Sequence, residues 1–184
     1  MKKIQNFKWF MPLAIFGVLV ASCAQQPYGE KVKVPFSGNK YESNSRFFRS
    51  VGKGISQKDN IAKSKADSEA KRILAAQVQT TVKVVTDQYL ADTQSNKEHE
   101  LNDKFQSLVR EVTATEIGDL RKIGDEKYFN GENYTAFVAY EIKKSAMLRF
   151  LKKKAKADAK IDRVMAKTME SMLDKEIERL ESLD

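Results

Sequence analysis

Cysteine and histidine are almost absent from this chain, since Cys23 and His99 are the only ones. A lone cysteine cannot form an internal disulfide, so the fold must depend on its hydrophobic core. One cysteine and one histidine also exclude a Cys/His zinc site and a Cys–His catalytic dyad. His99 lies in a polar run between Ser95 and Glu100, which predicts a surface position rather than a catalytic one.

A large excess of charge of one sign is also missing. The net charge is +8, and three lysines fall in an N-terminal segment that we expect to be removed, which leaves about +5. That balance and the lack of a nucleic-acid motif predict no nucleic-acid partner. The acids around the second predicted helix show none of the burial that tunes a catalytic carboxylate pair, so we expect no catalytic residue, metal or cofactor. These acids are Glu98, Glu100, Asp103, Glu111 and Glu116.

The chain has a single long apolar run, residues 9–21, which follows Lys2, Lys3 and Lys8. It is shorter than the about 20 residues of a membrane-spanning helix, and a positive start before an apolar core is typical of a secretion signal. The run ends in Val20-Ala21-Ser22-Cys23, which resembles the lipobox of bacterial lipoproteins. The resemblance implies that residues 1–22 are removed and that Cys23 carries a thioether-linked diacylglycerol and an acylated amine.

Acyl chains explain how such a protein is held. Each buried methylene contributes about 0.8 kcal/mol, so one chain binds marginally and two or three bind stably. We therefore expect the lipid bilayer to be a partner through Cys23, with no transmembrane helix after it. The residue after the cysteine is Ala24 and not aspartate. In this respect the chain resembles lipoproteins that are sent to the outer membrane, so we expect it there, facing the periplasm. Residues 23–45 are rich in turn residues and polar spacers and are predicted to be the acylated cysteine and a flexible tether.

Residues 46–55 are predicted to form a strand with one face of small residues, Ser50, Gly52 and Gly54. Ser56 is the predicted N-cap of a long helix over 57–90, whose first half presents alanines at three- and four-residue steps. A glycine face against an alanine face indicates close packing of strand and helix. Gln57 stands where a dinucleotide-binding fingerprint needs its third glycine, which argues against nucleotide binding.

A second, shorter helix is predicted from apolar residues at helical spacing, and β-type residues follow it from Thr113 to Phe129. The apolar positions of that helix are Leu101, Phe105, Leu108, Val109 and Val112. Asn130-Gly131 predicts a hairpin with a type I′ turn, in which both central residues have positive φ. The return strand, Tyr134 to Ile142, alternates cleanly.

Glycine and proline are missing after Gly131, so residues 146–184 are predicted as a charged C-terminal helix that could be one rod. Its first part is basic, and Lys152 to Lys156 could bind anionic head groups or cell-wall polymer, or form a solvated face. Its second part is acidic and carries an apolar stripe that packs either on the protein's own sheet or on a second chain. The stripe comprises Met165, Met169, Met172, Leu173, Ile177 and Leu180.

The lipobox, the tether, Phe48 to Gly54, the alanine-spaced helix and the Gly131 hairpin together resemble the twenty-kilodalton LPP lipoprotein family. They also resemble the related amino-terminal domain of the flagellar-assembly lipoprotein FlgT, over about residues 46–142. The resemblance implies a small envelope domain without catalytic residues. We therefore expect an α+β fold over 46–145, comprising a strand, a long helix, a shorter helix and a β-hairpin, plus the C-terminal helix.

The expected function is that of a non-enzymatic envelope lipoprotein that binds or positions other envelope components, including other envelope proteins, or self-associates through the C-terminal helix. A lipoprotein with a small-ligand pocket is the alternative, and a hydrolase is third, because neither a nucleophile–base pair nor a metal cluster is visible. A pocket would need aromatic side chains that converge on a cavity, although aromatics more often form a core. The aromatics to examine are Phe47, Phe48, Phe129, Tyr134, Phe137 and Tyr140.

Overall fold

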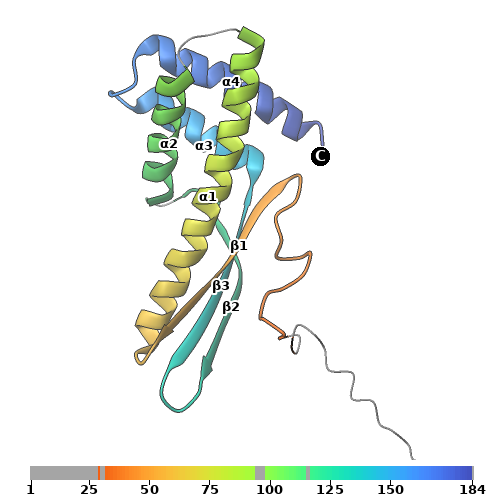
Figure 1. Cartoon of the computed structure of the whole chain (residues 1–184), viewed down its shortest axis with the longest axis vertical. Helices are drawn as coiled ribbons and strands as arrows, with labels where there is room; N and C mark the ends of the chain where they lie inside the picture. The colour runs from red at the N-terminus through yellow and green to blue at the C-terminus, as the bar shows by residue number, and fades with distance from the viewer. Residues whose placement is uncertain (1–28, 30–31, 94–97, 115–116, 184) are drawn as a thin grey trace, which may run out of the picture. The chain divides into compact units, whose positions relative to one another are not determined.

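The fold combines a three-stranded antiparallel sheet with helices, so the predicted α+β class and its element order are confirmed (Figure 1). The computed structural model describes residues 29, 32–93, 98–114 and 117–183. Cys23, the predicted signal peptide and Glu116 lie outside these residues. The elements are β1 (Phe47–Ser56), α1 (Asp59–Thr93), α2 (Glu98–Ala114), β2 (Arg121–Phe129), β3 (Tyr134–Lys143), α3 (Lys144–Ala157) and α4 (Arg163–Glu181).

The strands lie in the order β1-β3-β2, with β3 in the centre. The predicted β2–β3 hairpin is confirmed, but its predicted turn type is wrong. Among the described turn residues only Gly131 has a positive φ, of 93°, whereas a type I′ turn needs two such residues. The Asn130 side chain instead accepts hydrogen bonds from the backbone N–H groups of Glu132 and Asn133, which builds a longer loop.

Close packing of α1 on β1 follows from the two glycines, as predicted. A Cβ atom on Gly52 would lie 2.0 Å from the carbonyl oxygen of Ala66, and one on Gly54 would lie 2.1 Å from that of Ala62. The helix begins at Asp59, two residues later than predicted. Ser56 is therefore not its N-cap, and its hydroxyl accepts from the N–H of Lys58 in the connecting turn.

The main core lies where the second half of α1 meets α2, α3 and α4, beyond the end of the sheet that the first half covers (Figure 1). The five apolar residues predicted for the second helix are all buried there. That helix continues to Ala114, so Thr113, predicted as β-type, is helical. Val109 and Val112, in the last turns of this helix, lie in the core, and this packing outweighs their β propensity.

The C-terminal region is two antiparallel helices rather than one rod. The chain turns at 158–162, where the carboxylate of Asp162 accepts from the N–H groups of Val164 and Met165 and caps α4. The predicted apolar stripe is buried, but against α3 and α1 rather than against the sheet. Opposite charges face each other across the pair, as in the 2.6 Å contact between Lys152 Nζ and Asp174.

Part of the segment predicted as a tether is folded. The ring of Phe36 packs on Gly124, where an added Cβ atom would lie only 2.6 Å from the Cε1 atom of Phe36. The same ring packs on Tyr41, with ring centroids 5.0 Å apart. Gly124 pairs with Ala139, whose side chain points away from α1. Residues 33–45 therefore belong to the folded body and cover part of the sheet face opposite α1.

Candidate binding groove at the open edge of the sheet

β1 is an edge strand, and the chain itself covers half of its free edge. The N–H of Phe47 donates to the Asn44 side chain at 2.9 Å, and its carbonyl accepts from the Asn44 N–H at 3.0 Å. The N–H of Arg49 donates to the Ser43 hydroxyl at 2.8 Å, and its carbonyl accepts from the Gln77 amide at 2.9 Å. These backbone groups point away from β3, so alternation places those of Val51, Lys53 and Ile55 on the same side.

The other half of this edge is open. Lys65 Nζ donates to the carbonyl of Ile55 at 3.2 Å. No described residue hydrogen-bonds the outward N–H and C=O groups of Val51 and Lys53, or the N–H of Ile55. Bare backbone groups of this kind are a ready template for another strand.

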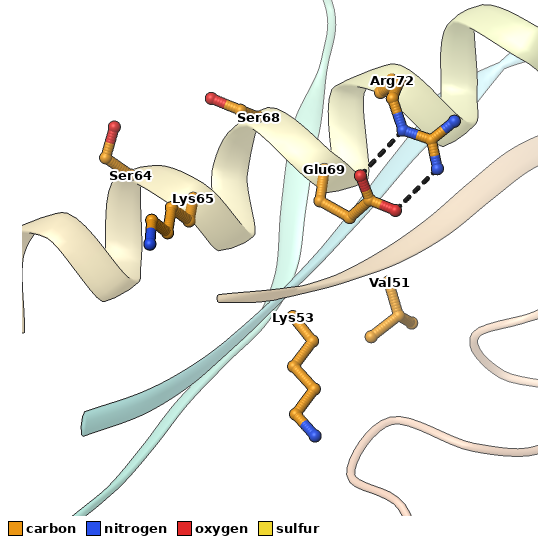
Figure 2. Close-up of a pocket in the computed structure, with 7 residues that line it drawn as sticks. All are labelled: Val51, Lys53, Ser64, Lys65, Ser68, Glu69 and Arg72. Carbon is orange, nitrogen blue, oxygen red and sulfur yellow. Dashed lines mark hydrogen bonds and ion pairs between the residues drawn. The ribbon is translucent and has the colours of Figure 1, made fainter. Parts of the chain in front are cut away.

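A groove of about 590 Å³ runs along this open stretch, between β1 and the first half of α1. Figure 2 shows that Val51 and Lys53 point away from α1. Ser64, Ser68, Glu69 and Arg72 project from α1, which lies above the strand in this view. We call this feature the edge groove. Its seven lining residues are Val51, Lys53, Ser64, Lys65, Ser68, Glu69 and Arg72.

The edge groove is basic. Arg72 donates to both carboxylate oxygens of Glu69, at 2.8 and 2.7 Å, and these bonds hold the pKa of that carboxyl below its usual value. Glu69 is thus neutralised within the groove. Lys53 Nζ lies 5.8 Å from the centre of the Phe137 ring, and Lys65 contacts only a carbonyl among its described hydrogen bonds. Two lysines therefore remain without a carboxylate partner in the described part of the chain.

A buried ion cluster anchors β1 beside the groove. Glu141 on β3 is 5% exposed and accepts from Arg49 Nε at 2.5 Å and from Arg121 on β2. Burial raises the pKa of the Glu141 carboxyl, but the hydrogen bonds from Arg121 and Arg49 outweigh it, so the pKa is lowered. One carboxylate thereby joins all three strands. No local sequence pattern indicated this cluster, because it depends on the strand order.

The structure places the residues that the sequence analysis considered for chemistry on the surface. His99, Glu100, Asp103 and Glu111 are exposed, as predicted. The side chain of Glu98 lies outside the described part. Within that part no group of three or more His, Cys, Asp or Glu residues could hold a metal ion.

The aromatics considered for a ligand pocket do not converge on one cavity. Phe48 lies in the core, and Tyr140 donates to Asp67 on α1. Phe129 stacks on Tyr134 at the hairpin end, with centroids 4.6 Å apart. None of the six lines the edge groove. Nothing in their arrangement supports the small-ligand alternative.

The basic stretch of α3 is partly neutralised within the protein. Lys152 contacts Glu170 at 3.3 Å and Asp174 at 2.6 Å, and Lys156 contacts Glu170. The hydrogen bonds from these two lysines also lower the pKa of Glu170. The interpretation as a patch for anionic polymers loses two of its lysines to α4. The edge groove is therefore the better candidate site.

No family model, curated protein or solved structure matches this chain. The resemblance to the LPP family thus stays a prediction. In the described residues, no helix has the length and apolar character needed to cross a membrane.

Proposed function

We propose that this chain is a non-enzymatic cell-envelope lipoprotein, anchored by acyl chains on Cys23, that binds or positions other envelope components. The observation that carries the proposal is the lipobox Val20-Ala21-Ser22-Cys23, at the end of the only long apolar run in the sequence. We place the protein on the outer membrane, facing the periplasm, because Ala24 follows the cysteine.

The fold adds a limit on reach. The folded body begins near Lys33, ten residues after Cys23. Ten extended residues span at most about 35 Å, half of what a tether reaching to residue 45 would allow. A folded body on so short a connecting segment stays near the membrane. This suits a protein that positions other envelope components at the membrane surface.

Binding rather than catalysis is favoured by the content of the edge groove. Its polar features are open backbone groups, two lysines, two serines and an internally paired Glu69–Arg72. Among the described residues neither Ser64 nor Ser68 hydrogen-bonds to a base, as an activated nucleophile would. Unpaired backbone groups instead offer the contacts by which one protein takes up a segment of another.

Palmitate labelling and membrane fractionation in the producing bacterium test the anchor. The parent chain should be labelled and sediment with membranes, and Cys23→Ser should be unlabelled and released. The double variant Cys23→Ser/Ser45→Cys is the matched control, since it restores a cysteine away from the lipobox and should stay unlabelled. A labelled, membrane-bound Cys23→Ser variant would refute the proposed anchor.

A further inference from the structure

We propose that the open half of β1, Val51 to Ile55, takes up an extended acidic segment of a partner protein as an additional strand. This inference rests on the proposed binding function and names the class of partner. It concerns a surface of the folded body and is independent of the anchor at Cys23.

The uneven treatment of the edge is the first argument. Proteins protect edge strands, because unpaired N–H and C=O groups invite pairing with another chain. This protein covers the outward groups of Phe47 and Arg49 with the side chains of Ser43, Asn44 and Gln77 and with the backbone N–H of Asn44. Among the described residues, none bonds the outward groups of Val51 and Lys53, which face the groove. The protection stops where the groove begins, as a docking edge requires.

The geometry fits a strand better than a compact ligand. Val51 and Lys53 each offer one N–H and one C=O, and Ile55 adds an N–H, at the two-residue spacing of a ladder. Alternate side chains of an added strand would face α1, near Ser64, Ser68 and Arg72. The others would extend the sheet face that carries Val51 and Lys53 (Figure 2).

The charge selects an acidic segment. Lys53 lies within the open stretch and Lys65 lies beside it on α1, both without a carboxylate partner among the described ion pairs, while Glu69 is held by Arg72. Lys53 projects on the side that alternate residues of an added strand would share, so a glutamate or aspartate there gains a cross-strand ion pair. A second copy of β1 is a poorer occupant, because it would bring a second Lys53 to the same edge. The two like charges would repel each other across the paired strands.

The binding test uses the full chain purified in detergent and a short synthetic peptide that alternates valine and glutamate, carrying a fluorophore. Its matched peptides carry lysine in place of glutamate, or N-methyl groups on alternate amides. We expect binding of the acidic peptide only, because the lysine peptide meets like charge and the methylated one cannot complete the ladder. Comparable binding of all three peptides, or of none, would overturn the proposal.

Two variants place the peptide on the protein. Lys53→Glu should weaken binding by about tenfold or more, since it reverses the cross-strand charge. Lys83→Glu is the matched control, because Lys83 is an exposed α1 residue away from the groove, and it should bind as the parent does. Equal weakening by both variants would show a non-specific charge effect and refute the site.

Amide hydrogen exchange at a saturating peptide concentration locates the bound peptide on the protein. The peptide should slow exchange at Val51 and Lys53, whose N–H groups are open, and leave Arg49, already bonded to Ser43, unchanged. Slowing that grows with protein concentration in the absence of peptide would mean that a second copy closes the edge, which would overturn the proposal. Failure of all these tests would leave the labelling of Cys23 unaffected, so the anchor and the groove are judged separately.

Discussion

The contact between Gly52 and α1 yields the sharpest prediction about the fold. In Gly52→Ala the added methyl carbon would lie 2.0 Å from the Ala66 carbonyl oxygen and 2.4 Å from the Ala70 nitrogen. Both atoms belong to the helix backbone, so no side chain can turn aside and α1 must move as a body. Both alanines are fully buried, and the shift would open the contact along the glycine face.

The magnitude follows from two opposing effects. Overpacking of a tight core contact lowers stability by about 1–3 kcal/mol, sometimes more, and backbone on the opposing side places this case at the upper end. Restricting the unfolded chain by replacing glycine returns about 0.4–1 kcal/mol. We expect a net loss of about 2 kcal/mol, which lowers the melting temperature by about 4–8 °C for a chain of this size.

Thermal and urea unfolding followed by circular dichroism measure this effect. Gly118→Ala is the matched control, because Gly118 is exposed, has no positive φ and has nothing within 4 Å of an added Cβ atom. It should stay within about 0.5 kcal/mol of the parent. A Gly52→Ala variant that melts with the parent would refute the close packing of β1 and α1.

The remaining predictions concern other contacts. Gly54→Val should destabilise the body for the same reason as Gly52→Ala, and unchanged melting would contradict it. Leu173→Asp places a carboxylate at a fully buried position and should cost at least about 3 kcal/mol without altering the mass in sedimentation, whereas dissociation of an oligomer would show that the stripe joins two chains. Folding lowers the pKa of Glu141, so its ion pairs should stabilise the body above the usual carboxyl pKa of about 4.3 and be lost as the pH falls below it. The urea midpoint of the parent should therefore drop more between pH 7 and pH 3 than that of Glu141→Gln, and equal drops would exclude a role for this cluster.

Strands and helices whose residues repeat at a regular local spacing could be predicted from the sequence. The glycines of β1 and the alanines of α1 repeat at the spacings of a strand and a helix, and their contact follows from those spacings alone. The C-terminal reversal was missed because it contains neither glycine nor proline and depends on the cap at Asp162. The signal was the split between a basic and an acidic half, which pair across α3 and α4.

The edge groove could not be predicted from the sequence, because it depends on which strand is central. A β-hairpin and a separate strand allow β1 to pair with either β2 or β3, and the observed order β1-β3-β2 determines which backbone groups of β1 stand at its free edge. The side chains that cover its other half come from positions as distant as Ser43 and Gln77. No sequence pattern at Ser43 or Gln77 predicts that its side chain covers the edge of β1.

Acylation of Cys23 is the basis of the proposed membrane anchor, and the intact mass of the mature protein extracted from membranes measures it. We expect a chain that begins at Cys23 and carries the added mass of a diacylglycerol, with or without a further acyl group on its amine. A chain that retains residues 1–22, begins elsewhere, or carries an unmodified Cys23 would refute the lipid anchor.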